Sequence, residues 1–395
     1  MQREHNETEH PTAFPSQSPA RLIRFAITVT VLLVLLHGYI GWQLLPDLAQ
    51  GRSGWLFGLL LLVSSTLLIP WGMLARFVIS SQPLSDRITW MGSLTMGLFS
   101  SVLVLTVLRD VVLALIGGSQ LNFASALLVP LLAVLITLVG FANARRLPRV
   151  VEIDVPLEGL PPALAGFTIV QISDIHVGPT IKRDYVQAVV ERVNSLGADL
   201  IAITGDVVDG SVPELAPHTQ PLANLQVRHG ACFVTGNHEY YSGAAQWVSE
   251  FRRLGLRCLM NEHVVLEHDG ASLVVAGVTD YSAHLFDPAQ QSNPQTALGG
   301  APAAMPKILL AHQPRSAKAA AAAGFDLQLS GHTHGGQFWP WNLFVRLQQP
   351  YTAGLHRLDH LWIYISRGTG YWGPPKRFGA PSEITRLHLV SAPSR

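Results

Sequence analysis

The stretch GHTHGGQ, residues 331–337, places two histidines on either side of one threonine and crowds them with glycines. An aliphatic run at 327–332 leads into this stretch and is typical of a buried β-strand. Two imidazoles among glycines are difficult to explain as core packing, because core positions favour apolar side chains. We therefore interpret His332 and His334 as candidate metal ligands at the end of a strand.

Four other polar stretches follow strand-like runs in the same way. They are SDIH (173–176), GDVVDG (205–210), GNHEYY (236–241) and AHQP (311–314). The apolar runs predict strands at 167–173, 199–205, 231–237, 272–278, 307–313, 327–332, 361–367 and 383–390. Helical spacing appears at 183–196, 243–254 and 316–323. This alternation indicates an α/β domain with mixed sheets, whose ligand site lies beyond the carboxyl ends of the strands.

The polar stretches offer more metal ligands than one tetrahedral ion can use. The candidates are Asp174, His176, Asp206, Asn237, His312, His332 and His334. Asp174 and His176 are expected on extended chain, where side chains two residues apart point the same way. Mixed oxygen and nitrogen donors suit Mn, Fe or Zn better than Mg or Ca. We expect two divalent ions that share the Asp206 carboxylate.

Two ions roughly 3.5–4 Å apart are the usual arrangement for phosphoester hydrolysis. We expect a hydroxide that bridges the ions to attack phosphorus in line with the leaving group. His238 follows the candidate ligand Asn237 and is placed to give the leaving alkoxide a proton or a positive neighbour. Glu239 is expected to orient His238.

These motifs together resemble the calcineurin-like metallophosphoesterase superfamily. The pattern of that family is D-x-H, G-D-x-x-D, G-N-H-[DE], a single His and G-H-x-H, and every part occurs here in that order. GHTHGGQ and the tail SRGTGYWGPPKRFGAPSEITRLHL (366–389) are most similar to the membrane-associated YaeI/YkuE-like branch. The resemblance covers about residues 150–393 and implies a four-layer α/β/β/α sandwich of two mixed sheets.

The resemblance also implies a role for each residue of the site. One metal ion would be held by Asp174, His176, Asp206 and His334, and the second by Asp206, Asn237, His312 and His332. His238 would be the catalytic acid or the stabiliser of the transition state. Asp209 would lie outside both coordination spheres and shape its loop.

The N-terminal part of the chain has a different character. Apolar runs fill 22–45, 55–78, 89–108 and 121–141, and each is long enough to cross about 30 Å of hydrocarbon. A soluble helical bundle is the alternative, but it would need four consecutive helices that are apolar all round. We expect a polar tail at 1–20 without stable structure, four transmembrane helices within 21–145, a linker and first strand at 146–166, and the phosphoesterase domain at 167–393.

The arginines that flank these runs predict the orientation in an inner or plasma membrane. One side of the membrane would carry Arg3, Arg21, Arg24, Arg76, Arg87, Arg145, Arg146 and Arg149. Only Arg52 and Arg109 fall on the other side, so the catalytic domain is expected in the cytoplasm. Asp110, beside Arg109, either marks a polar site in the membrane or ends the third span, and we favour the second reading.

Substrate features are less distinctive in the sequence. Arg367 and Arg377 lie in late loops and either clamp a phosphate or pack on the sheet. Four aromatic residues follow GHTHGGQ: Phe338, Trp339, Trp341 and Phe344. They either wall a groove, rest on the bilayer or belong to the core, and we slightly favour the core.

The expected function is hydrolysis of a phosphodiester or pyrophosphate bond at the membrane, in a substrate that a lipid anchor would suit. Two alternatives stay open: a phosphomonoesterase, and a membrane sensor or regulatory module that carries a phosphoesterase domain. Residues 150–395 hold 17 Lys/Arg and 20 Asp/Glu, a balance that argues against a nucleic-acid surface. The two cysteines, Cys232 and Cys258, are expected to be buried apolar residues.

Overall fold

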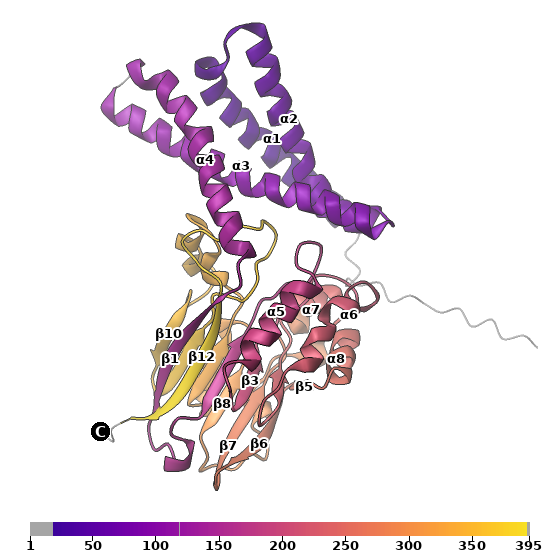
Figure 1. Ribbon diagram of the computed structural model, residues 1–395, viewed down its shortest axis with the longest axis vertical. Helices are drawn as coiled ribbons and strands as arrows, with labels where there is room; N and C mark the ends of the chain where they lie inside the picture. Colours follow the sequence, from indigo (N-terminus) through magenta and orange to yellow (C-terminus); the bar gives the residue numbers. More distant parts are fainter. Residues whose placement is uncertain (1–18, 118, 393–395) are drawn as a thin grey trace, which may run out of the picture.

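The computed structural model describes residues 19–117 and 119–392. Four long helices come first, and two β-sheets with shorter helices follow (Figure 1). The long helices are α1 (Pro19–Leu48), α2 (Gly51–Val78), α3 (Gln82–Ile116) and α4 (Asn122–Arg145). The expected unstructured tail falls mostly on residues 1–18, which lie outside the described residues, whereas Pro19 and Ala20 belong to α1.

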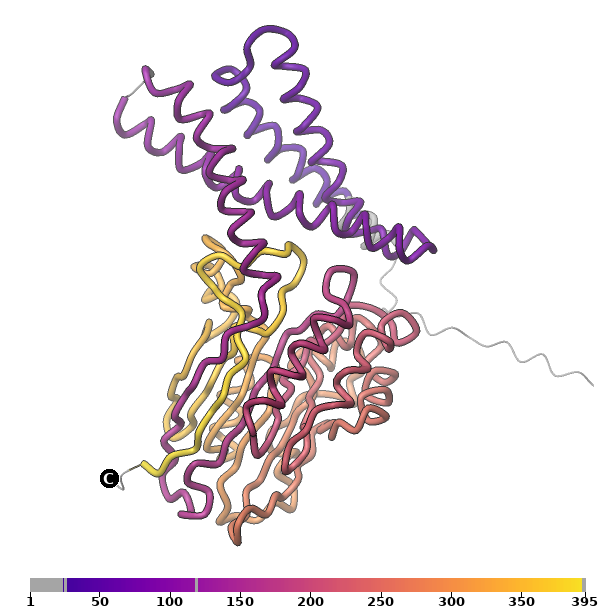
Figure 2. Tube along the Cα trace, in the orientation of Figure 1, coloured from indigo at the N-terminus to yellow at the C-terminus, as the bar shows by residue number. Residues whose placement is uncertain are grey.

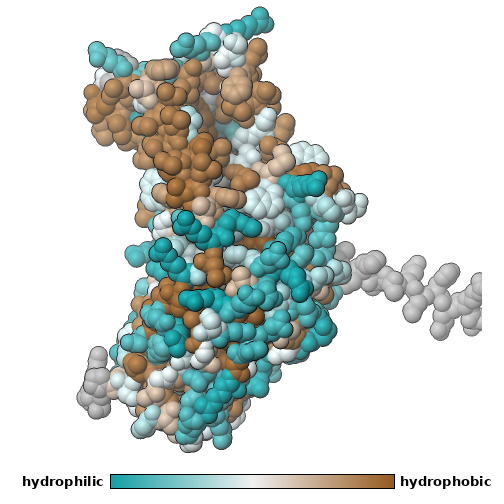
Figure 3. All heavy atoms as spheres, viewed as in Figure 1, coloured by the Kyte–Doolittle hydropathy of each residue, from teal (hydrophilic) through white to brown (hydrophobic). Residues whose placement is uncertain are grey.

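Within the described residues, these four helices are long and apolar enough to cross a membrane. Figure 3 shows their side chains as a largely brown, hydrophobic surface above a mostly hydrophilic remainder. Large apolar side chains such as Leu35 and Leu131 point outward and are 65% and 59% exposed. A soluble bundle would bury such side chains, because their transfer from water is favourable. The predicted all-α region of four apolar helices is confirmed.

Small residues allow α2 and α3 to approach each other closely. A Cβ atom on Gly72 of α2 would lie only 2.6 Å from the Cα atom of Gly92 of α3. Close contact through glycine is typical of helix pairs in membranes, where van der Waals packing drives association.

The prediction that Arg109 and Asp110 end the third span stays a prediction. Helix α3 continues past them to Ile116, and the side chain of Arg109 is buried within the helical region. Its guanidinium pairs with Asp47 of α1 and donates to Ser125 Oγ of α4 at 2.9 Å. Burial of a charge requires such partners, so Arg109 ties three helices together near one end of the bundle.

Two mixed six-stranded sheets form the remaining part of the chain. The first has the order β1-β12-β2-β3-β4-β5 and the second β10-β11-β9-β8-β7-β6. The strands of the first sheet are β1 (Arg149–Leu157), β2 (Thr168–Ile172), β3 (Leu200–Ile203), β4 (Ala231–Phe233), β5 (Arg257–Cys258) and β12 (Glu383–Ser391). Those of the second are β6 (Glu262–His268), β7 (Ala271–Gly277), β8 (Lys307–Leu310), β9 (Leu327–Ser330), β10 (Gly354–Leu358) and β11 (Leu361–Ile365).

Three apolar layers hold these sheets between helices. Side chains such as Ile169 and Leu329 fill the space between the two sheets. Trp247 and Phe251 of α8 belong to the cluster that covers the first sheet, and Phe325 belongs to the cluster on the second. The helices are α5 (Arg183–Asn194), α6 (Val212–Thr219), α7 (Asn237–Ser242), α8 (Ala244–Arg253), α9 (Pro294–Ala297) and α10 (Ala317–Ala323). The predicted four-layer α/β/β/α sandwich is confirmed, and both cysteines are buried as expected.

Strand β1 leads the chain directly out of α4 into the sandwich. It runs parallel to β12 along its whole length, from Arg149 opposite Glu383 to Leu157 opposite Ser391 (Figure 2). The first sheet is therefore joined to the end of the last long helix with only residues 146–148 between them.

Candidate metal centre

Five loops bring the predicted ligands to one edge of the sandwich. Each loop begins at the carboxyl end of a strand, namely β2, β3, β4, β8 or β9. The ligands that these loops carry are Asp174 and His176, Asp206, Asn237, His312, and His332 with His334. Because two sheets contribute, residues 160 positions apart in the chain become neighbours in space.

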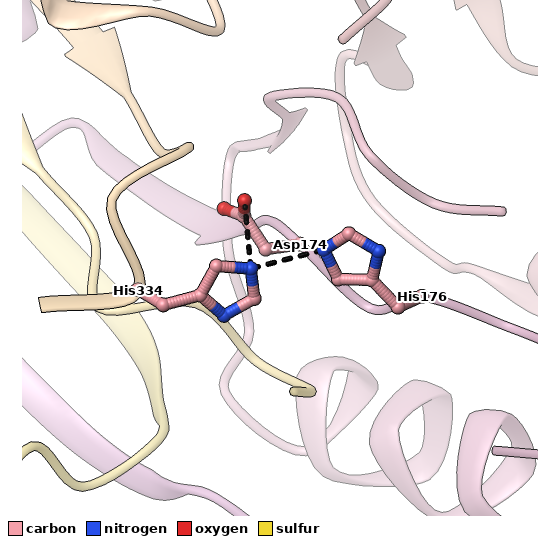
Figure 4. A group of neighbouring side chains, drawn as sticks. All are labelled: Asp174, His176 and His334. Carbon is pink, nitrogen blue, oxygen red and sulfur yellow. Dashed lines mark hydrogen bonds and ion pairs between the residues drawn. The ribbon is translucent and has the colours of Figure 1, made fainter. Parts of the chain in front are cut away.

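The first group of ligand atoms consists of Asp174, His176 and His334 (Figure 4). The Nε2 atoms of His176 and His334 face each other at 2.9 Å, and His334 Nε2 lies 3.4 Å from Asp174 Oδ1. Two ligands that each lie about 2.1 Å from one ion at a right angle would be about 3 Å apart. The spacing of this group therefore fits a single metal ion.

The second group consists of Asp206, His312 and His332. His312 Nε2 lies 3.1 Å from Asp206 Oδ2 and 3.2 Å from His332 Nδ1. The side-chain oxygen of Asn237 is buried and has no hydrogen-bond partner among the described residues. A buried polar atom without a partner is costly, so this oxygen has the chemistry expected of a metal ligand.

Asp206, a member of the second group, also lies next to the first. Its Oδ2 atom is 3.1 Å from His312 Nε2 in the second group and 4.0 Å from His176 Nε2 in the first. One carboxylate oxygen therefore approaches ligands on both sides. This arrangement suits a carboxylate shared by two ions.

The two histidines of GHTHGGQ fall into different groups. His332 lies with Asp206 and His312, whereas His334 lies with Asp174 and His176. This grouping is the one expected if each imidazole served its own ion. Their assignment as metal ligands stays a prediction.

The expectation of extended chain at Asp174 and His176 is wrong. Both residues have left-handed backbone angles, with φ of 53° and 55°, and Asp206 has φ of 52°. His332 and His334 share this conformation, with φ of 71° and 51°. Such angles cost of order 1–3 kcal/mol each in residues with a Cβ atom and cluster at functional sites. The ligands converge through left-handed backbone positions and not through strand geometry.

Two glycines allow the loops after β3 and β4 to touch. A Cβ atom on Gly236 would lie 2.2 Å from Asp206 Oδ1, and one on Gly205 would lie 2.6 Å from the backbone nitrogen of Gly236. Any side chain at these positions would displace Asp206. The glycines of the G-D and G-N-H motifs therefore make room for the Asp206 carboxylate.

The electrostatics of the site also suit cations. Burial would lower the pKa of His312, but Asp206 and Asp174 together raise it well above its ordinary value. A proton held by neighbouring carboxylates occupies a place that a metal ion would fill. Burial and then His312 lower the pKa of His332 to about 3, so its ring is neutral, as ligation requires.

His238 is held by Asp209 and not, as predicted, by Glu239. Its Nδ1 atom lies 2.5 Å from Asp209 Oδ1, and the same oxygen lies 3.1 Å from His176 Nδ1. Glu239 is buried and accepts backbone N–H bonds from Gly236 and Val207. Asp209 thus orients two imidazoles instead of only shaping its loop, and Glu239 joins the loops after β3 and β4.

The two arginines for which phosphate binding and packing were both left open have partners within the sandwich. Arg377 is 1% exposed and donates from Nη1 to the backbone carbonyl of His334 at 2.8 Å. Arg367 pairs with Glu383 at 2.8 Å. For Arg377 the burial favours packing beside a candidate ligand over direct contact with a substrate.

Two exposed aromatic residues that were not predicted as site residues lie beside His238. The rings of Tyr241 and Trp372 meet its imidazole edge-on, with centroids 5.2 and 5.7 Å away. They are 40% and 53% exposed. Tyr241 is adjacent to the G-N-H-E motif and could have been suspected, whereas Trp372 comes from a distant loop.

The aromatic residues after GHTHGGQ divide between the core and the surface. Phe338 is buried, but Trp341 and Phe344 are 44% and 52% exposed. The indole nitrogen of Trp341 donates to Ser100 Oγ of α3 at 2.8 Å. The expectation of ordinary core is therefore wrong for Trp341 and Phe344, and also for Trp339, which is 37% exposed. Trp341 contacts the membrane helices.

Comparison with known proteins places this site in a family context. Residues 167–336 match the family model described as "Calcineurin-like phosphoesterase". A zebrafish (Danio rerio) protein named "Transmembrane protein with metallophosphoesterase domain" is 36% identical over 279 residues, which are 69% of this chain and 64% of that protein. The bovine (Bos taurus) protein of the same name is 40% identical, over 67% of this chain and 63% of its own length.

A bacterial relative matches this chain over a larger share of its own length. The Bacillus subtilis protein named "Uncharacterized metallophosphoesterase YkuE" is 30% identical over 266 residues, which are 64% of this chain and 90% of that protein. The chain thus spans less than two thirds of the two vertebrate relatives but most of the bacterial one.

Proposed function

Because the chain belongs to the calcineurin-like phosphoesterase family, we propose that it is a metal-dependent phosphoester hydrolase anchored in a membrane by α1–α4. One observation carries this proposal: two groups of ligand atoms flank the Asp206 carboxylate at spacings suited to metal coordination. A calcium- or magnesium-type site would use oxygen ligands almost alone. The four histidines favour Mn, Fe or Zn.

Each ion has a defined set of residues in this proposal. The first set is Asp174, His176, Asp206 and His334, and the second is Asp206, Asn237, His312 and His332. When bound, the ions would supply an acidified water as the nucleophile and neutralise charge on the phosphoryl oxygens.

His238 supplies the proton to the leaving group in the proposed reaction. Burial opposes its protonation, but Asp206 and Asp209 raise the pKa of His238 to about 9. The imidazole is therefore protonated at neutral pH, as a general acid must be. Asp209 holds Nδ1, and Nε2 lies 4.0 Å from Asp206 Oδ2, beside the proposed place of the phosphoryl group.

The surroundings of the site favour a lipid-linked phosphodiester or pyrophosphate. Trp372 beside His238 is followed by Gly373, where a Cβ atom would lie 3.5 Å from Met96 Cε of α3. Arg76 at the end of α2 donates to the backbone carbonyl of Asp209 at 3.4 Å. An exposed tryptophan at the junction of the catalytic and membrane parts suits a substrate with one polar and one apolar end.

We place the catalytic domain in the cytoplasm. Arg76 and Arg145 contact the sandwich, Arg145 through the backbone carbonyl of Thr180 at 2.9 Å. These arginines therefore mark the end of the bundle that adjoins the catalytic domain. Positively charged ends of membrane helices face the cytoplasm.

The experiment is Mn-supplemented hydrolysis of bis(p-nitrophenyl) phosphate by the purified full chain in detergent. We expect Asp206→Asn and His238→Ala to lower turnover by at least about 100-fold. Glu267→Gln, at an exposed position on β6, is the matched control and should leave turnover unchanged. Turnover unaffected by either site substitution would refute the assignment, and faster turnover of p-nitrophenyl phosphate would favour a phosphomonoesterase.

A further inference from the structure

A loop of the sandwich inserts a lysine between two membrane helices. Lys376 lies between β11 and β12 and is 1% exposed. Its aliphatic chain runs past Gly140 of α4, where a Cβ atom would lie 2.7 Å from Lys376 Cγ. A Cβ atom on Gly97 of α3 would lie 3.7 Å from Lys376 Cδ. Gly140 therefore leaves the space that the lysine fills, whereas a Cβ atom on Gly97 would only reach ordinary van der Waals contact with it.

The ammonium group of Lys376 binds uncharged partners in the bundle. It donates to the carbonyl of Gly97 at 2.9 Å, to Ser101 Oγ and to Thr137 Oγ1 at 3.3 Å. Among residues 19–117 and 119–392 no ion pair of Lys376 is found. Burial lowers its pKa to about 8. A buried cation is tolerated only with good hydrogen bonds, so this is a specific contact.

The next residue links this contact to the metal centre. The backbone nitrogen of Arg377 donates to the carbonyl of Gly140 at 2.9 Å, and its carbonyl accepts from Asn143 Nδ2 at 3.2 Å. Its buried guanidinium donates to the carbonyl of His334 at 2.8 Å and places Nη2 3.0 Å from His334 Nδ1. Helix α4 is therefore connected to a candidate ligand through one residue.

The two ligand groups differ in this respect. The first group contains His334, which Arg377 connects to α4. In the second group, His312 places Nδ1 2.7 Å from the carbonyl of Thr204, inside the sandwich. Among the contacts described, only the first group contains a ligand that is hydrogen-bonded to a residue in contact with the membrane helices.

We propose that Lys376 and Arg377 are positioning residues through which α3 and α4 hold His334, so that the membrane bundle completes the first metal site. This inference rests on the proposed function, since it requires a two-ion centre. Residues that orient a ligand typically contribute 10–100-fold to metal affinity. The bundle then has a role in the active site as well as in anchoring.

The test counts manganese ions per chain in the full protein, purified in detergent and equilibrated with Mn²⁺ at a concentration that fills both wild-type sites. Gly140→Val removes the space for Lys376, and Lys376→Met keeps the length of the side chain but removes its N–H donors. Gly38→Val is the matched control, because a Cβ atom on Gly38 of α1 meets nothing within 4 Å. Metal content is read by mass spectrometry of the elements, without an activity assay.

We expect Gly140→Val and Lys376→Met each to retain about one ion, and Gly38→Val to retain both. The ion that stays in the second group shows that the variant is folded. Retention of both ions in either variant, or loss of both, would overturn the inference. A wild-type chain without bound Mn²⁺ would instead refute the proposed function, and the inference with it.

Discussion

Asp209 and His238 are joined by a 2.5 Å contact between Oδ1 and Nδ1, and the same carboxylate oxygen lies 3.1 Å from Nδ1 of His176. One side chain thus orients both the proposed acid and a proposed ligand. The pKa of Asp209 is held far below its ordinary range: burial alone would raise it, but His176 and His238 outweigh burial. Asp209 is therefore a permanent negative charge beside both rings.

This relationship predicts a pH dependence. His238 has a pKa raised to about 9, so activity that needs its proton should persist at neutral pH and fall as the pH rises through about 9. Asp209→Asn removes one of the carboxylates that raise this pKa, so the decline should begin at lower pH. The pH profile of kcat measures this.

Asp269→Asn is the control for that profile, because Asp269 is exposed and pairs with Arg228 away from the site. An alkaline decline at the same pH in wild type and Asp209→Asn would show that His238 is not the group that titrates.

The two histidines of GHTHGGQ should contribute to different ions. His332→Ala and His334→Ala should each lower the metal content by about one ion, since each side chain belongs to one group of ligands. Elemental analysis of the purified full chain tests this, with circular dichroism to verify folding. Loss of both ions from either single substitution would mean that the two sites bind cooperatively.

Glu239 should matter for stability more than for chemistry. Its buried carboxylate accepts from the backbone nitrogens of Gly236 and Val207 at 2.7 Å each. Each oxygen of Glu239 accepts from two backbone N–H groups. Glu239→Gln replaces one of these oxygens by an amide donor, so two buried N–H groups lose their acceptor, at a cost of at least about 1–3 kcal/mol. Thermal unfolding of the metal-free protein measures the loss.

Exposed Glu267→Gln is the reference for this comparison. An unfolding temperature of Glu239→Gln equal to that of the reference would contradict the account of Glu239 as the link between two loops.

Trp372 should select for an apolar substrate. Trp372→Ala should lower kcat/KM roughly tenfold for p-nitrophenyl hexadecyl phosphate in mixed micelles, the effect of losing about 1.4 kcal/mol of apolar contact. It should leave kcat/KM for bis(p-nitrophenyl) phosphate nearly unchanged. Trp42→Ala, at an indole on α1 that is 79% exposed against 53% for Trp372, is the control. An equal loss on both substrates would argue against a lipid-linked substrate.

The ligands could be predicted because each belongs to a short local motif placed after a strand. The residues that orient these ligands could not be predicted. Asp209 orients His238 and Glu239 joins two loops, the reverse of the expected roles, because of the way in which the loops after β3 and β4 meet. The left-handed backbone angles at Asp174 and His176 could not be predicted from the sequence either, because aspartate and histidine do not require them.

The strands that were missed share a physical cause. β5, β6 and β10 lie at edges of their sheets, where polar side chains replace the continuous apolar run of a central strand. Glu262, Glu267 and His268 interrupt the run in β6. The burial of Arg377 could not be predicted for a different reason, because its guanidinium donates to the carbonyls of His334 and Gly370, and no local pattern predicts these contacts.

The central claim is a two-ion centre that shares Asp206. Its most direct test is anomalous X-ray diffraction from crystals of the full chain grown with Mn²⁺. The account predicts two anomalous peaks roughly 3.5–4 Å apart on either side of the Asp206 carboxylate, one beside His334 and the other beside His332. A single peak, or peaks away from Asp206, would contradict it.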